Sequence, residues 1–158
     1  KMTVSVAMHR YGKINDLFMR ERTSKGLHVA DMEKNAAVVM MRALKRNEIV
    51  GVMGDRDPTE QGVMIECFGR QCRLPQGPAR LSLATGAPLM PAFCLRRTND
   101  SFSMAFLEPV PIATEGTREE KVRKMTQQFA DTIAETIQLF PEQRAVFYPF
   151  WDSEWKPE

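Results

Sequence analysis

A run of five apolar residues, Ile49-Val50-Gly51-Val52-Met53, constrains the fold of this chain more than any other feature. A short, wholly apolar run is typical of a central strand in a parallel sheet, because such a strand is covered on both faces. The charged sequence Gly54-Asp55-Arg56-Asp57 follows at once. Ligands of open α/β sheets bind beyond the carboxyl ends of strands, so the sequence predicts a polar site here.

Segments with strand and helix periodicity alternate along the chain. Helices are expected over 13–23, from a cap at Asp31 to about 46, from 77 to the residue before Gly86, and from a capping box at 117–120 to about 140. Strands are expected over 3–8, 27–30, 49–53, 63–68, 89–95 and 102–107. The alternation predicts an α/β fold with a mixed, largely parallel sheet flanked by helices.

Length and composition indicate one globular domain over residues 1–158. Hydrophobic residues make up 43% of the chain and charged residues 27%, which is ordinary for a soluble protein. The net charge of +2 does not favour nucleic acid as a partner, although it permits an acidic ligand or an anionic membrane surface. No apolar run approaches the roughly 18 residues of a membrane helix.

The three cysteines, Cys67, Cys72 and Cys94, lack the spacing of metal ligands, and the two histidines are too few for a metal cluster. We therefore expect buried or free thiols, a reducing compartment and no metal site. The chain starts at Lys1 and enters a strand-like run directly, which leads us to expect further residues upstream.

The tripeptide Asp55-Arg56-Asp57 supports three interpretations. Two carboxylates one residue apart can hold a divalent metal that bridges phosphates. Arginine can bind a phosphate through two hydrogen bonds. The structural alternative is a strand-end turn, in which Asp57-Pro58 shapes the backbone and Arg56 pairs with a neighbouring carboxylate.

Other candidate site residues lie at element ends. Gly77-Pro78-Ala79-Arg80 begins a helix, where free N–H groups, the helix dipole and a cation can bind an anion; a plain helix start is the alternative. Arg10 and Arg22 are possible phosphate contacts, and Arg10 directly follows a strand. His9 is the candidate general base, although its spacing to Asp16 gives no reason for an oriented imidazole.

The aromatic segment from Phe147 to Trp151 has two interpretations. Trp and Tyr are favoured at membrane interfaces, and the segment would then touch a lipid surface. Alternatively, it packs over the sheet.

Taken together, the motifs resemble the lipid A biosynthesis acyltransferase family. This family belongs to the lysophospholipid acyltransferase superfamily and includes the mycobacterial phosphatidylinositol mannoside acyltransferases. Order and spacing carry the resemblance, which runs from about Val4 to Glu142. Its marks are Arg10, Arg22 with Gly26, Ala43-Leu44-Lys45 to Asn47-Glu48, Gly54-Asp55-Arg56-Asp57, Gly62-Val63, Phe68-Gly69, Pro75-Gln76-Gly77-Pro78-Ala79, Thr85-Gly86-Ala87-Pro88 with Pro91, and Pro141-Glu142-Gln143.

The resemblance implies the glycerolipid acyltransferase fold, truncated at the N-terminus. It also implies transfer of a fatty acyl chain from an acyl-carrier-protein or CoA thioester to a hydroxyl of a membrane glycolipid, such as a lipid A precursor. The enzyme would touch an anionic membrane at the cytoplasmic face of the bacterial inner membrane and need no cofactor beyond the thioester.

The family's catalytic histidine lies in an H-x4-D/E motif, which this chain lacks, and His9 does not align with it. The expectation is therefore a soluble fragment that is inactive alone because its base lies upstream. The substrate-binding residues would be Arg10, Arg22, Asp55, Arg56, Asp57, Gly69, Gly77, Pro78, Ala79 and Arg80.

The chain departs from the family pattern at two places. Cys67 replaces the first of two phenylalanines, and 144–151 replaces a tryptophan and paired arginines, which leaves the acceptor open. Two alternative functions remain: a non-catalytic lipid- or anion-binding module, and a metal-dependent nucleotide or sugar transferase that uses Asp55 and Asp57.

Overall fold

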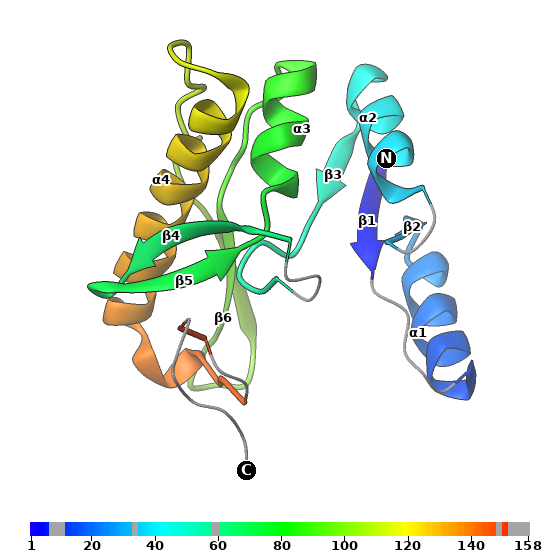
Figure 1. The fold of residues 1–158 in the computed structure, drawn as a ribbon. Helices are drawn as coiled ribbons and strands as arrows, with labels where there is room; N and C mark the ends of the chain where they lie inside the picture. The colour runs from blue at the N-terminus through cyan, green and yellow to red at the C-terminus, as the bar shows by residue number, and fades with distance from the viewer. Residues whose placement is uncertain (7–11, 33–34, 58–60, 148–149, 152–158) are drawn as a thin grey trace. The chain divides into compact units, whose positions relative to one another are not determined.

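A computed structural model of the chain describes residues 1–6, 12–32, 35–57, 61–147 and 150–151 (Figure 1). The described chain forms two compact units, Lys1–Met53 with Ala84–Ala87, and Gly54–Leu83 with Pro88–Glu158. That residues 1–158 form a single domain stays a prediction.

The first unit holds a three-stranded parallel sheet in the order β2-β1-β3. Its strands are β1 (Met2–Val6), β2 (Leu27–Asp31) and β3 (Ile49–Gly51), and its helices are α1 (Gly12–Ser24) and α2 (Ala36–Lys45). Ala36, Met40 and Ala43 of α2 are buried at helical spacing. The expected α/β class, with a parallel sheet flanked by helices, is confirmed. The central strand expected over 49–53 is wrong, because β3 ends at Gly51 and lies at the edge of this sheet, where Ile49 is exposed.

The expected cap at Asp31 is wrong. Asp31 is the last residue of β2 and pairs with Val6, and the next N–H, that of Met32, donates to the Val6 carbonyl at 3.2 Å. These ladder bonds keep the chain extended where a cap would have turned it, and helix α2 starts five residues later. Met32, the residue that follows β2, is exposed.

The second unit contains two antiparallel hairpins. In the first, β4 (Val63–Cys67) and β5 (Arg70–Leu74) pair from Val63↔Leu74 to Cys67↔Arg70. Phe68 and Gly69 form the turn with φ values of 56° and 71°, and two left-handed residues are what a type I′ turn requires. The expected strand over 63–68 thus ends one residue early, and β5 was not expected.

The second hairpin joins β6 (Ala92–Arg96) to β7 (Phe102–Phe106). Helix α3 (Gly77–Thr85) was expected at its observed position. Helix α4 (Arg118–Leu139) is followed by a short 3-10 turn, η1 (Pro141–Gln143). The expected strand over 89–95 starts three residues late, although Leu89 makes an isolated bridge with Val110.

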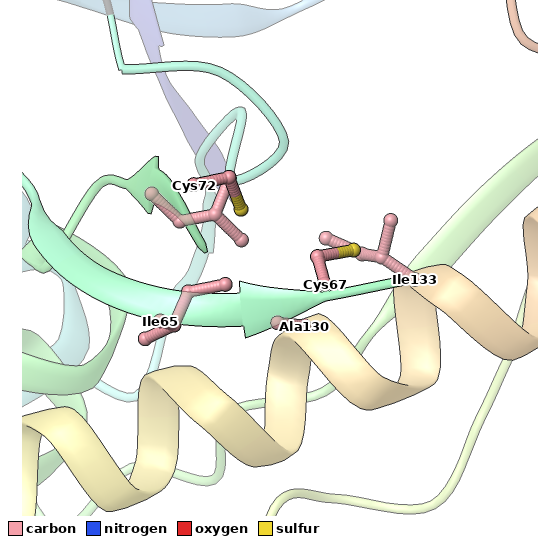
Figure 2. Packing of buried hydrophobic residues seen from close by; sticks show 6 residues of the cluster. Ile65, Cys67, Cys72, Ala130 and Ile133 are labelled. Atoms are coloured by element: carbon pink, nitrogen blue, oxygen red, sulfur yellow. The ribbon is translucent and has the colours of Figure 1, made fainter. Parts of the chain in front are cut away.

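Helix α4 packs against the β4–β5 hairpin to form the main core of the second unit. Figure 2 shows Ile65 and Cys67 of β4 close to Ala130 and Ile133 of α4. At the other end of α4, Val122 and Met125 pack with Ala79 of α3. The buried apolar residues of α4 recur at helical spacing and form the face that the helix packs against the rest of this unit.

The capping box expected at 117–120 is present. The Thr117 hydroxyl accepts from the Glu120 N–H, and the Glu120 carboxylate accepts from the Thr117 N–H at 2.7 Å. These bonds hold the pKa of the Glu120 carboxyl below its ordinary value. Because the pKa of this carboxyl is lower in the folded state than in the unfolded state, its contribution to stability is fully present above the unfolded-state pKa. This contribution is lost as the pH falls through the folded-state pKa.

Thr117→Ala is expected to lower the free energy of unfolding by about 1 kcal/mol at neutral pH, because the first turn of α4 loses a hydrogen-bond acceptor. Urea unfolding followed by circular dichroism measures this change. Thr114→Ala is the matched control, since Thr114 is exposed and precedes the helix. Equal midpoints for the two variants would contradict the capping role.

The three cysteines are free thiols, of which Cys67 and Cys72 are buried and Cys94 is exposed. A hydrogen bond with Cys72 lowers the pKa of the Cys67 thiol, and the same bond together with burial raises the pKa of Cys72. The free thiols that the sequence indicated are therefore present.

Their burial predicts that only one thiol of this chain, Cys94, reacts quickly with Ellman's reagent in the folded state. The other two are expected to react once urea unfolds the chain. Cys94→Ser is expected to remove the fast phase. A fast phase that survives this substitution would place Cys67 or Cys72 in contact with solvent.

Candidate functional site

The charged sequence after β3 is held by an arginine from the far end of the chain. Arg144 Nη1 donates to Asp55 Oδ2 in an ion pair, and Arg144 Nη2 donates to the Asp55 carbonyl oxygen at 3.3 Å. The side chain of Arg144 is 21% exposed and that of Asp55 is 30% exposed. One guanidinium therefore holds both the side chain and the main chain of Asp55 in a partly sheltered place.

Two glycines let this segment approach its neighbours closely. Gly54 is buried, and a Cβ added to it would lie 2.5 Å from Cε1 of Phe129 on α4. A Cβ added to Gly62 would collide with the backbone carbonyl of Leu74. Neither place has room for a side chain, which gives a physical reason for glycine in these two motifs.

The segment is also tied to the start of α3. The Gly62 N–H donates to Asp57 Oδ2, and Gln76 Nε2 donates to the Gln61 carbonyl at 2.7 Å. Gln76 lies directly before Gly77, the first residue of α3. The two motifs that the sequence analysis singled out, 54–57 and 77–80, are thus joined through a short chain of hydrogen bonds within the second unit.

The η1 turn fixes Arg144 to the end of β6. The side chain of Gln143 pairs with the backbone of Arg96, accepting from its N–H at 3.1 Å and donating to its carbonyl at 3.2 Å. Pro141 opens this turn. The Pro141-Glu142-Gln143 motif therefore places the next residue, Arg144, against Asp55.

Part of the aromatic segment packs on the same unit. Trp151 Nε1 donates to the Cys67 carbonyl at 3.0 Å, and the guanidinium carbon of Arg70 lies 5.1 Å from the centre of the Trp151 ring. Phe150 lies edge-on to Trp151 and under Arg144. Packing is thus the correct interpretation for Phe150 and Trp151, whereas Phe147 is 94% exposed.

Outside the 54–57 and 77–80 motifs, the sequence indicated four candidate residues, Arg10, His9, Arg22 and Gly69. Arg10 and His9 lie outside the described residues. Arg22 lies in the first unit, where its guanidinium carbon is 5.3 Å from the centre of the Phe18 ring. Gly69 is exposed and has a backbone reason for being glycine, its positive φ in the hairpin turn.

At the start of α3, Gly77 and Arg80 are exposed, whereas Pro78 and Ala79 are buried. Ala79 belongs to a core cluster with Met125. An anion at this helix start would therefore meet Gly77 and Arg80, while Pro78 and Ala79 support the helix from the core side.

Both carboxylates of the Asp55-Arg56-Asp57 tripeptide bind protein donors, Asp55 the guanidinium of Arg144 and Asp57 the N–H of Gly62. This arrangement matches the strand-end turn better than a paired metal site. Among the residues that the structure describes, no three His, Cys, Asp or Glu side chains lie together so that they could hold a metal ion.

Sequence reasoning missed Arg144 and Gln143 as parts of this site. Asp55 and Arg144 are 89 positions apart, so no local spacing links them. The signal that was present is the Pro141-Glu142-Gln143 motif, whose structural effect is to place the arginine that follows it.

None of the helices in the described part of the chain has the length and hydrophobicity needed to cross a membrane.

The sequence model of the family described as bacterial lipid A biosynthesis acyltransferase matches residues 1–153. The chain belongs to this family of acyltransferases, as the resemblance in its motifs indicated.

Among curated proteins, the chain is similar to the phosphatidylinositol mannoside acyltransferase of Mycobacterium tuberculosis (strain ATCC 25618 / H37Rv). The two are 31% identical over 137 residues, which cover 85% of this chain and 42% of the relative. The enzyme of the same name from Mycolicibacterium smegmatis (strain ATCC 700084 / mc(2)155) is 30% identical over 144 residues, covering 89% of this chain and 45% of the relative. The chain thus spans less than half the length of these relatives.

Proposed function

We propose that the intact protein transfers a fatty acyl chain from an acyl-carrier-protein or CoA thioester to a hydroxyl of a membrane glycolipid. The observation that carries this proposal is the family match over residues 1–153. The relatives are named for phosphatidylinositol mannoside, so a mannosylated phosphatidylinositol stands beside a lipid A precursor as the acceptor to test first.

In this reaction the hydroxyl oxygen attacks the thioester carbonyl carbon, the C–S bond breaks, and the hydroxyl proton passes through a base to the leaving thiolate. Histidine is the usual base for such a step near neutral pH. We place this base in an H-x4-D/E motif of the intact protein, upstream of Lys1. No cofactor beyond the thioester is needed.

Residues 1–158 would then supply acceptor binding and orientation. Both acceptor classes carry phosphate, which arginine binds through two hydrogen bonds. Arg56 follows the peptide that Arg144 holds, and Gly77 with Arg80 offers N–H groups and a cation at a helix start. Arg10, Arg22, Asp55 and Asp57 are further proposed substrate-binding residues of the intact enzyme. Holding the acceptor in one orientation lowers the entropic part of the barrier.

The proposed place of action is the cytoplasmic face of a bacterial inner membrane, with peripheral contact to an anionic lipid surface. A protein that takes both a thioester donor and a lipid acceptor must work where the two meet. The donor is a soluble thioester, whereas the acceptor stays in the lipid layer.

The test is an acceptor panel with the full-length natural protein and labelled palmitoyl-CoA or acyl carrier protein thioester. The acceptors are phosphatidylinositol mannoside, a lipid A precursor, and a mannosylated diacylglycerol without phosphate. We expect labelled product with a phosphorylated acceptor and at least tenfold less without phosphate. Binding of the glycolipids without any transfer would favour the non-catalytic module instead.

A further inference from the structure

The ion pair between Arg144 and Asp55 is more sheltered than the ion pair between Arg96 and Asp100. Arg144 and Asp55 are 21% and 30% exposed, whereas Arg96 and Asp100 are 63% and 81% exposed. Shelter from water reduces screening and makes an ion pair more effective. Loss of one partner therefore leaves a poorly solvated charge, a larger change than loss of an exposed pair.

Arg144 is itself held on both sides along the chain. Before it, Gln143 pairs with both backbone polar groups of Arg96. After it, Phe150 lies under the guanidinium, with 5.6 Å between Arg144 Cζ and the ring centre. A long side chain normally pays conformational entropy to hold one position, and these contacts reduce the freedom left to lose.

The second bond of Arg144 reaches the carbonyl of Asp55, which belongs to the peptide that joins Asp55 to Arg56. A guanidinium that binds this carbonyl and the adjacent carboxylate fixes the orientation of that peptide. The orientation of the peptide sets where the backbone of Arg56 begins. Arg144 also offsets the negative charge of Asp55, which would otherwise repel a phosphate bound at Arg56.

We propose that Arg144 is a positioning residue that fixes the 54–57 segment and neutralises Asp55 so that a phosphorylated acceptor can bind there. The effect on the reaction rests on the proposed acyltransferase function. The effect on the segment rests only on the contacts of Arg144 with Asp55, and it can be measured without any substrate.

The experiment compares full-length Arg144→Ala, Arg144→Lys and Asp55→Asn with the wild type. The control is Arg123→Ala, since Arg123 is an exposed arginine of α4. Hydrogen exchange of the amides at 54–57 is measured first. We expect exchange in Arg144→Ala to be at least tenfold faster than in the wild type. Asp55→Asn is expected to exchange about as fast as Arg144→Ala, and Arg123→Ala as slowly as the wild type. Unchanged exchange in Arg144→Ala would overturn the positioning role.

Steady-state kinetics then test the charge. Arg144→Ala is expected to raise KM for the phosphorylated acceptor three- to tenfold with a smaller change in kcat, and Arg144→Lys is expected to restore part of the loss. Faster exchange with unchanged KM and kcat would overturn a role in the reaction. If Arg144→Ala exchanges faster and the wild type transfers no acyl chain, the proposed function is refuted. The positioning of the 54–57 segment by Arg144 is then still established.

Discussion

Gly62→Ala is expected to lower the free energy of unfolding by about 2–4 kcal/mol, because the added Cβ has no space. It would meet the backbone carbonyl of Leu74 and the carboxylate of Asp57. The Leu74 backbone cannot move aside easily, because its side chain is fully buried and Leu74 pairs with Val63 in the β4–β5 ladder. The change therefore strains the ladder itself, and not only a flexible side chain.

Urea unfolding of the wild type and two glycine variants tests this prediction. The matched control is Gly77→Ala, since a Cβ on Gly77 would meet no atom within 4 Å and the backbone there is not left-handed. Gly77→Ala is expected to change the free energy of unfolding by less than about 0.5 kcal/mol. Equal stability of the two variants would show that Gly62 does not approach Leu74 as described.

Arg56→Ala is expected to lower turnover of the intact enzyme at least tenfold, equivalent to about 1.4 kcal/mol of transition-state stabilisation, and to leave the fold intact. Alanine removes the fork that we propose binds the acceptor phosphate. Arg56→Lys keeps the charge without the planar fork, so an intermediate rate is expected.

The measurement is the steady-state transfer rate to a phosphorylated acceptor, with the urea midpoint as the check on folding. Arg123→Ala, which changes an exposed arginine of α4, is expected to transfer at the wild-type rate. Near-normal transfer by Arg56→Ala would remove Arg56 from the site. A lowered urea midpoint would show instead that Arg56 supports the fold.

The elements that the sequence predicted best have strong local signals. Helix α4 combines a capping box at Thr117, a buried apolar stripe and a proline directly beyond Phe140, so its limits differ from the expected ones by about one residue. Strand β5 has mostly exposed residues, and only Cys72 and Leu74 are buried. Its hairpin turn is Phe68-Gly69, not one of the common asparagine-glycine or aspartate-glycine pairs, so nothing local indicated it.

The candidate site was predicted only in part, because only some of its features have a local signal in the sequence. The charge of 54–57 and its place after an apolar strand are local facts and indicated a polar site. The contact with Arg144 is a tertiary fact across 89 positions, and only folding brings the two side chains together. Likewise, the close approach of Gly54 to Phe129 gives the reason for glycine at position 54, and this reason is not visible in the sequence.

The most direct test of the proposed function is acyl transfer from a labelled acyl thioester to a membrane lipid extract, with product identified by mass. The full-length natural protein and residues 1–158 are assayed side by side. We predict labelled glycolipid with the full-length protein and none with residues 1–158, because we place the base upstream. No transfer by the full-length protein across broad donor and acceptor panels would contradict the acyltransferase function. Transfer by residues 1–158 alone would contradict the upstream base and make His9 the candidate.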